Sequence, residues 1–206
     1  MSSLLESLQK MLGEKRLSRI AHTKIGIGGL GGLGSNVACH LVRSGFTHLV
    51  LADFDKVEAG NLNRQFYFED QIGCLKTEAL AQNLRRIHAQ LDLTLCPERV
   101  TAENLPRIFG ECVIWVEAFD KPEAKKMFVE AALTLGKPVV SASGLGGWGQ
   151  ADTLTTTLRH PGWAVIGDLR TAAGAEHPPL SPRVGVAAAK EADIVLTWAL
   201  GEEVKQ

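Results

Sequence analysis

The fold is decided by residues 24–34, which read Lys24-Ile-Gly-Ile-Gly-Gly-Leu-Gly-Gly-Leu-Gly34. The first five residues are typical of a short buried strand, and a helical pattern of apolar residues follows over residues 33–42. At the junction, Gly29, Gly31 and Gly34 have the spacing G-x-G-x-x-G that nucleotide-binding loops show between a strand and a helix. Glycine lets a backbone approach a phosphate closely, and the start of a helix offers free N–H groups to an anion. The stretch therefore predicts a nucleotide site, although glycine here could also serve strand–helix packing alone.

Strand-like and helix-like segments alternate outward from this stretch. Further strands are expected at residues 48–53, 112–117, 138–142 and 151–158, and helices at residues 4–12, 75–88 and 122–135. The last of these helices would have Asp120 as its N-cap and Pro122 in its first turn. This alternation predicts a single α/β domain over residues 1–206, with a Rossmann-like, mostly parallel sheet and helices on both faces.

The two ends of the chain have patterns of their own. A helical segment is expected over about residues 1–20. Residues 159–183 contain four prolines and few apolar side chains, so a long loop is expected there. An apolar helix is expected at residues 184–200, where Gly201 would end it.

Composition excludes several classes of protein. The 206 residues carry 22 basic and 23 acidic side chains, for a net charge of −1, and 45% are hydrophobic. These values are ordinary for a soluble globular protein and argue against a disordered, collagen-like or coiled-coil chain and against a nucleic-acid-binding surface. No apolar run approaches the ~20 residues that cross a bilayer, and the N-terminus lacks a secretory signal pattern. The four cysteines form no CxxC pair, so a cytoplasmic, reducing location without membrane contact is expected.

An acidic residue and two cations follow the glycine loop. Asp53 lies 19 residues after Gly34 at the expected end of a strand, where a carboxylate can accept hydrogen bonds from a ribose. Loop and acid together do not separate a dinucleotide from ATP. Arg64 and Lys76 favour ATP, because a triphosphate and its leaving pyrophosphate need charge neutralisation, whereas an NAD site does not need both cations. Each cation taken alone could also be an ordinary surface residue.

Asp120 is the candidate metal ligand. It follows the strand expected at residues 112–117, at the carboxyl edge of the sheet where ligands of open α/β sheets collect. A carboxylate there could hold Mg²⁺ against the phosphates. On local sequence, Asp120 could equally be only a helix cap, and Asp55 and Asn61 could be only turn residues.

Five sequence blocks together resemble the ThiF/MoeB/HesA family of adenylating enzymes, the bacterial relatives of ubiquitin-activating enzymes. The blocks are residues 27–34, Asp53-Phe-Asp55, Asn61-Leu-Asn-Arg-Gln65, Gly73-Cys-Leu-Lys76 and Asp120. The resemblance covers about residues 24–150 and is closest to the short ThiF type. It implies that MgATP adenylates the C-terminal glycine carboxylate of a small β-grasp sulfur carrier ending in Gly-Gly. ThiS of thiamine (thiazole) biosynthesis and MoaD are such carriers.

The resemblance also implies a role for each site residue. Asp53 corresponds to the ribose-binding acid, and Arg64 and Lys76 correspond to the cations at the phosphates. Asp120 corresponds to the magnesium-associated acid, so Arg64, Lys76 and Asp120 are the expected catalytic residues. The expected nucleotide-binding residues are Gly29, Gly31, Gly32, Gly34, Asp53, Asp55, Asn61, Arg64, Gln65 and Lys76.

The chain departs from the family pattern in three places. No cysteine follows Cys112, so the tetrathiolate zinc site of many members is not expected. The loop expected at residues 159–183 also has no cysteine. Adenylation would then need no thiol of this chain, Cys74 included, and either a separate donor protein or sulfide itself would supply sulfur. The N-terminal arginine block of longer members is missing, and Arg16 or Arg19 could replace it by reaching the nucleotide of a partner in a homodimer.

Two other functions stay open from the sequence. A carrier-binding subunit without turnover would explain the missing loop cysteine and the atypical N-terminus. An NAD-dependent oxidoreductase would explain the glycine loop and Asp53 but would leave Arg64 and Lys76 unused.

Overall fold

Short apolar runs form the strands of one seven-stranded sheet. The computed structural model describes residues 3–204. The strand order is β3-β2-β1-β4-β5-β7-β6, and each neighbouring pair is parallel except β6 and β7. The strands are β1 (Ile25–Gly28), β2 (His48–Ala52), β3 (Asp92–Cys96), β4 (Ile114–Glu117), β5 (Val139–Ala142), β6 (Thr155–His160) and β7 (Trp163–Gly167).

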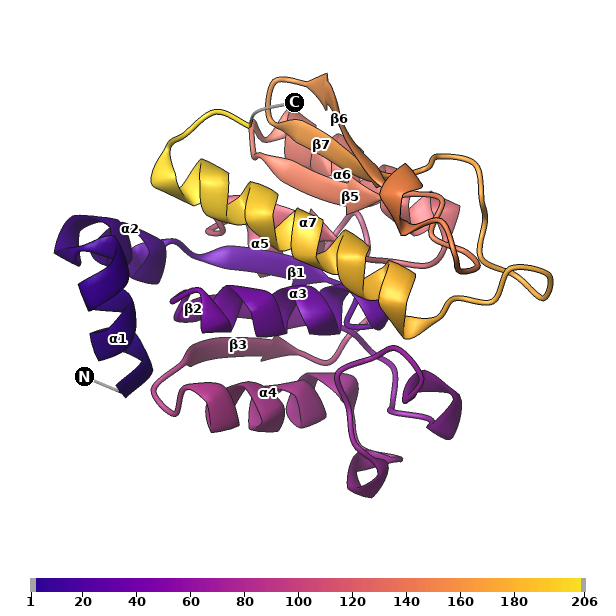
Figure 1. The fold of residues 1–206 in the computed structure, drawn as a ribbon, viewed down its shortest axis with the longest axis horizontal. Coiled ribbons are helices and arrows are strands. Elements are labelled where there is room, and N and C mark those ends of the chain that lie inside the picture. Colours follow the sequence, from indigo (N-terminus) through magenta and orange to yellow (C-terminus); the bar gives the residue numbers. More distant parts are fainter. Residues whose placement is uncertain (1–2, 205–206) are drawn as a thin grey trace.

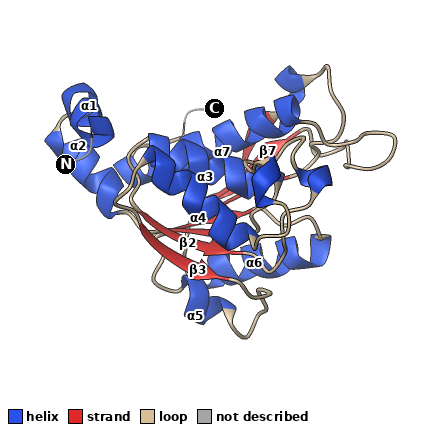
Figure 2. Ribbon diagram, turned by 90° about the horizontal axis from the view of Figure 1, so that it is seen from below, coloured by secondary structure: helices blue, strands red, loops and turns tan. Residues whose placement is uncertain are grey.

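Helices cover both faces of this sheet. The α-helices are α1 (Ser3–Leu12), α2 (Glu14–His22), α3 (Gly32–Arg43), α4 (Lys76–Ile87), α5 (Leu105–Phe109), α6 (Pro122–Thr134) and α7 (Ser181–Leu200). The helices α3, α4 and α7 lie on one face, and α5 and α6 lie on the other (Figures 1 and 2). The short helices α1 and α2 project beside the amino end of β1 (Figure 1). Within residues 3–204, no helix is long and apolar enough to cross a membrane.

The alternation of side chains along the strands divides the core into two apolar clusters. In β4, Ile114 and Val116 join the cluster beneath α3 and α7, whereas Trp115 packs with Phe109 of α5 and Phe128 of α6. Parallel strands that are buried on both faces have continuous apolar sequences, and this is why β1, β2, β4 and β5 could be predicted. The predicted α/β fold, with a mostly parallel sheet and helices on both faces, is confirmed.

The connectivity places a crevice at one edge of the sheet. From β1 the chain moves outward through β2 to β3, and it then returns to the other side of β1 at β4. Ligands of open α/β sheets bind where the strand order reverses, at the carboxyl ends of the strands. In this sheet that position is the edge formed by the ends of β1, β2 and β4.

The segment expected to be a loop at residues 159–183 contains a strand. The apolar sequence Trp163–Gly167 forms β7 and pairs with β5 on one side and β6 on the other. The expectation was wrong because Pro161 and Gly162 belong to the turn of a hairpin and not to a long loop. Gly162 takes φ +84°, which glycine adopts without strain.

The final helix begins earlier than predicted. It starts at Ser181, and Pro182 occupies its first turn, where a missing N–H leaves no hydrogen bond unmade. The irregular part of the C-terminal region is therefore residues 168–180. The predicted end at Gly201 is confirmed, since Gly201 has φ +70° and its N–H bonds to Trp198.

Several other elements differ from expectation at their ends or were not predicted. Residues 151–153 form a short 3₁₀ turn, so β6 begins only at Thr155. The N-terminal helical segment is divided by Gly13 into α1 and α2. The edge strand β3 and the single-turn helix α5 were not expected, because both are short and neither has a long apolar run.

Close backbone packing at the start of α3 requires glycine at position 34. A Cβ on Gly34 would overlap the carbonyl oxygen of Gly29, whereas a Cβ on Gly31 would meet nothing closer than Gln65 Nε2 at 3.8 Å. Gly31 also has φ −76°, which lies outside the left-handed region that favours glycine.

We expect Gly34→Ala to lower the free energy of unfolding by about 3 kcal/mol, because the backbone around Gly29 must shift to make room. Gly31→Ala should change it by less than about 1 kcal/mol. Urea unfolding followed by circular dichroism measures both, and equal losses in the two variants would contradict the packing argument.

The core beneath α7 contains a carboxyl group with no partner. Glu191 is 0% exposed, and neither of its oxygens has a hydrogen-bond partner among residues 3–204. Burial raises the pKa of Glu191 well above its ordinary value. The charge of Glu117 raises the pKa further, and Lys125 opposes this effect. The folded protein therefore keeps Glu191 protonated at pH values where an unfolded glutamate is ionised.

The free energy of unfolding should fall as the pH rises above about 4.3, the ordinary pKa of a glutamate, because the unfolded chain releases the Glu191 proton first. The Gln side chain in Glu191→Gln resembles the protonated acid, so this variant should lack this part of the decline. The difference in free energy of unfolding between the variant and the wild type should therefore grow with pH. Urea unfolding at three pH values tests this, with the exposed Glu103→Gln as the matched control. A decline in Glu191→Gln as steep as in the wild type would refute it.

Candidate functional site

The glycine loop joins β1 to α3 at the carboxyl edge of the sheet. Gly29 has φ +88°, and its N–H donates to the carbonyl of Ala52 at 2.9 Å. A Cβ on Gly29 would lie 2.6 Å from the carbonyl oxygen of Ala118. The loop thus touches the ends of both β2 and β4, and it brings the first N–H groups of α3 to the crevice. Free N–H groups at a helix start bind phosphates.

Asp53 braces this loop from the end of β2. It is 8% exposed, and its Oδ2 accepts the N–H of Leu30 at 2.6 Å while its Oδ1 accepts the N–H of Asp55 at 2.8 Å. The structure therefore places Asp53 beside the glycine loop, as the sequence predicted. The bracing role was not predicted, because nothing local links Asp53 to a residue 23 positions earlier. Each carboxylate oxygen retains a lone pair that a ribose hydroxyl could use.

Lys76 is a buried cation paired with Asp55. Its Nζ lies 3.0 Å from Asp55 Oδ2, and its side chain is 8% exposed. Its backbone N–H donates to the carbonyl of Asp55, so the segment after β2 and the start of α4 run side by side. Tyr67 ties the same region to the glycine loop, since its hydroxyl donates to the carbonyl of Leu30 at 2.8 Å. Lys76 therefore lies at the crevice and not among solvated surface residues.

The segment at residues 61–65 lies over the start of α3. The aliphatic part of Arg64 packs on Gly32, where a Cβ would be 3.4 Å from Arg64 Cγ. Its guanidinium donates to the carbonyl of Gly60 and to Asn63 Oδ1. Asn36 of α3, which the sequence did not single out, holds the segment by donating to the carbonyl of Arg64 at 2.8 Å. Arg64 is thus brought to the glycine loop.

Asn61 and Gln65 have different surroundings in this segment. Asn61 Oδ1 accepts the N–H of Glu58 at 3.0 Å, which is the turn role that the sequence left open. Gln65 is buried against the glycine loop, and its Oε1 has no hydrogen-bond partner within the described part of the chain. A buried amide oxygen without a partner is costly, and a bound ligand that donates to it would remove the cost.

Asp120 lies at the same edge, two residues beyond Ala118. Ala118 bonds through its N–H to the carbonyl of Gly28, so the turn after β4 is fixed beside β1. Asp120 itself is exposed, and α6 begins at Pro122 with Lys121 in the cap position. The helix-cap role considered for Asp120 is therefore wrong, because the helix starts one residue too late for it.

The residues at this edge fit a nucleoside triphosphate with an associated Mg²⁺. The glycine loop and the start of α3 offer N–H groups, Arg64 and Lys76 offer positive charge, and Gln65 Oε1 has no partner. Within residues 3–204, no three His, Cys, Asp or Glu side chains form a metal site. One carboxylate, such as that of Asp120, together with phosphate oxygens and water is the usual coordination of Mg²⁺ in nucleotide sites.

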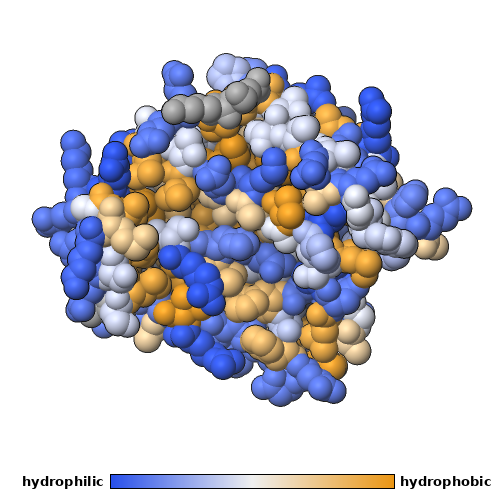
Figure 3. All heavy atoms as spheres, viewed as in Figure 1, coloured by the Kyte–Doolittle hydropathy of each residue, from blue (hydrophilic) through white to orange (hydrophobic). Residues whose placement is uncertain are grey.

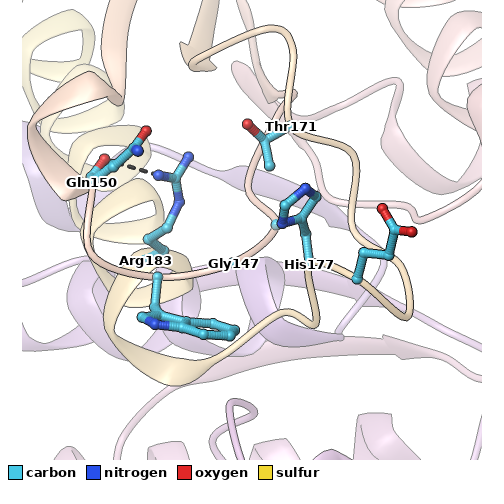
Figure 4. Close-up of a pocket in the computed structure, with 8 residues that line it drawn as sticks. Gly147, Gln150, Thr171, His177 and Arg183 are labelled. Carbon is cyan, nitrogen blue, oxygen red and sulfur yellow. Dashed lines mark hydrogen bonds between the residues drawn. The ribbon is translucent and has the colours of Figure 1, made fainter.

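A second feature of the same edge is a pocket of about 440 Å³ (Figure 4). One wall is the loop after β5, and the other is the irregular segment between β7 and α7. The pocket is lined by Gly146, Gly147, Trp148, Gln150, Thr171, Glu176, His177 and Arg183.

The pocket adjoins the glycine loop. Asn63 donates to the carbonyl of Pro179 at 3.3 Å, and Val184, the residue after Arg183, packs on Gly32. This pocket was not predicted from the sequence. A usable signal was present in a second glycine cluster, Gly144-Leu-Gly-Gly-Trp-Gly149, but the opposite wall is brought to it only by the fold.

The sequence matches the ThiF family over residues 3–191. The chain belongs to the ThiF family. Among its relatives, it is 34% identical over 152 residues to adenylyltransferase and sulfurtransferase UBA4 of Candida glabrata, which covers 73% of this chain and 34% of the relative. It is 32% identical over 203 residues to the UBA4 protein of Emericella nidulans, which covers 91% of this chain and 42% of the relative. This ThiF-family chain thus spans less than half the length of these relatives.

Solved structures show the same fold. Escherichia coli tRNA N6-threonylcarbamoyladenosine dehydratase, TcdA, in complex with ATP superposes with a TM-score of 0.81 at 21% identity, covering 96% of this chain and 92% of TcdA. E. coli MccB with ATP gives a TM-score of 0.73 at 22% identity, covering 90% of this chain and 58% of MccB. At these identities the likeness establishes the fold, and the family predicted from the sequence blocks is confirmed.

The two cations at the glycine loop predict that the protein binds MgATP and not NAD, which calorimetric titration with each ligand tests. Arg64→Met keeps the methylenes that pack on Gly32 and should weaken ATP binding about tenfold, the effect of losing one charged contact. Arg86→Met, an exposed change on α4, should leave the affinity unchanged. Tight NAD binding without ATP binding would contradict the assignment of this edge.

Proposed function

We propose that this protein uses ATP to adenylate the C-terminal glycine carboxylate of a small ThiS-like sulfur carrier that ends in Gly-Gly. The observation that carries the proposal is the packing of Arg64 on Gly32 of the glycine loop, with a pocket adjoining that loop. Lys76 pairs with Asp55, two residues after Asp53. Asp120 follows Ala118, which lies against Gly29. Nucleotide binding alone would not require a second pocket, whereas transfer of an adenylyl group to another molecule requires both.

The reaction needs little covalent chemistry from the protein. An oxygen of the carrier carboxylate attacks the α-phosphorus of ATP, the bond to the β-phosphate breaks, and pyrophosphate leaves with the electron pair. The N–H groups of the glycine loop and of α3 would hold the phosphates, and Arg64 and Lys76 would neutralise the charge that develops on them. When bound, Mg²⁺ would supply further positive charge at the pyrophosphate, and Asp120 would hold it there.

Relatives support a nucleotide-activating function of this kind. The UBA4 proteins are named adenylyltransferase and sulfurtransferase, and E. coli TcdA and MccB have structures with ATP. The ThiS-type carrier and a role in thiamine biosynthesis are proposed from the resemblance to short ThiF proteins. A separate sulfur donor would then convert the acyl-adenylate, because residues 159–183 contain no cysteine. The four unpaired cysteines support a reducing, cytoplasmic location.

A homodimer is part of this proposal. Arg16 and Arg19 lie on α2, which ends just before β1 and so stands at the amino edge of the sheet, opposite the carboxyl edge that carries the glycine loop. Arg19 packs against Gly201 at the end of α7 in its own chain. An arginine of α2 would therefore serve only the nucleotide of a second copy. The apolar face of α7 packs against α3 and the sheet within the same chain.

The face of the molecule that carries α3, α4 and α7 has apolar and polar side chains interspersed (Figure 3).

Asp120→Ala should abolish carrier-dependent exchange of pyrophosphate into ATP, because Mg²⁺ would lose its protein ligand. The free energy of unfolding should change by less than about 0.5 kcal/mol, since the side chain is exposed. Exchange with ThiS-type and MoaD-type carriers, together with urea unfolding, measures both quantities.

Cys74→Ala is the matched control, because Cys74 is an exposed residue close to Lys76 in the chain. It should retain exchange if no thiol takes part. Full exchange in the Asp120→Ala variant would refute the role of Asp120, and a wild type that binds MgATP but exchanges with no carrier would instead favour a carrier-binding subunit without turnover.

A further inference from the structure

The loop that forms one wall of the pocket is held by its backbone carbonyl groups. This pocket loop, residues 143–150, begins directly after β5. Arg183 at the start of α7 donates to the carbonyl of Gly144 at 3.2 Å and to that of Gln150 at 2.8 Å. Lys125 of α6 donates to the carbonyl of Ala142, immediately before the loop, at 3.2 Å. Two cations thus hold the loop close to both of its ends.

Arg183 is itself held by a buried ion pair. Its side chain is 3% exposed, and its Nη2 lies 2.8 Å from Asp168 Oδ2. Asp168 follows β7 on the opposite wall, and its Oδ1 accepts the N–H groups of Arg170 and Thr171 at 2.9 and 2.8 Å. Burial alone would raise the pKa of Asp168, but the N–H groups of Thr171 and Arg170 and the guanidinium of Arg183 hold it well below its ordinary value. Asp168 is therefore a permanent anion that connects the two walls.

The two walls are in direct backbone contact. A Cβ on Gly146 would lie 2.6 Å from the carbonyl oxygen of Ala172 and 2.9 Å from that of His177. A Cβ on Gly144 would overlap the carboxylate of Asp168. The walls are thus so close that only glycine fits at positions 144 and 146 of the pocket loop.

A role in stability alone does not account for this arrangement. Moving two charges out of water costs free energy that their attraction only partly returns. Replacing a buried ion pair by well-packed apolar residues is therefore often neutral or stabilising. The bonds of Arg183 to the two loop carbonyls set the geometry of the walls, which apolar side chains would leave unspecified.

We propose that Arg183 is a positioning residue that, with Asp168, sets the width of the pocket and thereby selects the protein terminus that is adenylated. This inference rests on the proposed function. In Arg183→Lys the cation remains, but an ammonium cannot reproduce the planar fork that reaches Asp168 and two carbonyls together. In Asp168→Asn the oxygen that accepts the N–H groups of Arg170 and Thr171 remains, while the ion pair is lost.

The test compares the wild type, these two variants and the control Arg159→Lys, which makes the same change at an exposed position of β6. The probes are MgATP and two forms of a ThiS-type carrier, one ending in Gly-Gly and one in Gly-Ala. We expect the dissociation constant of MgATP to stay within about twofold of the wild type in every variant. The half-saturating concentration of the Gly-Gly carrier in pyrophosphate exchange should rise about tenfold or more in both pocket variants, with the maximal rate nearly unchanged. The ratio of pyrophosphate exchange with the Gly-Gly carrier to that with the Gly-Ala carrier should fall at the same time.

The outcomes separate the inference from the proposed function. If the wild type binds MgATP but exchanges with no carrier, the proposed function falls and the inference falls with it. If the wild type exchanges, and both folded variants keep its half-saturating carrier concentration and its preference for the Gly-Gly carrier, only the inference is overturned. A lower melting temperature in those variants would then show that Arg183 and Asp168 serve stability. If neither variant folds, the pair serves stability and the positioning role is likewise rejected.

Discussion

The hydrogen bond from the Leu30 N–H to the Asp53 carboxylate is the contact on which the candidate site at the carboxyl edge of the sheet depends. At 2.6 Å it connects the glycine loop to the end of β2, and the second oxygen of Asp53 holds the N–H of Asp55. Asp55 in turn pairs with Lys76 at the start of α4. One buried carboxylate therefore sets the relative positions of the loop and of a cation beside it. Without it, the backbone N–H of Leu30 would be buried and unsatisfied, which is costly.

The helix α7 connects the two halves of the candidate site. Arg183 at its start holds the pocket loop, Val184 in the next position packs on Gly32 of the glycine loop, and Glu191 lies two turns further on in the core. The first turn of one helix therefore contacts both the pocket loop and the glycine loop, which fixes where the pocket lies relative to that loop.

The elements that meet at the candidate site could be predicted because their signals are local. The glycine spacing follows a strand and precedes a helix within eleven residues, and Asp53 and Asp120 each follow an apolar run that is recognisable as a strand. The prediction of a long loop at residues 159–183 failed because proline serves two purposes in this segment. Proline marked residues 159–183 as a loop, yet Pro161 lies in a hairpin turn and Pro182 lies in the first turn of a helix. Composition does not distinguish these uses, whereas the pairing of β7 with β5 does.

From the sequence alone, the parallel α/β fold was determined, and candidate site residues at the carboxyl edge of its sheet were identified. Apolar periodicity defines the elements, and parallel strands must all end at one edge of the sheet. Only the tertiary structure decided that Asp53 braces the glycine loop, that Lys76 is paired with Asp55, and that Arg183 and Asp168 form the pocket. These contacts join residues that are 15 to 39 positions apart in the chain. Their geometry depends on how strands and helices pack, and no local pattern of residues encodes that packing.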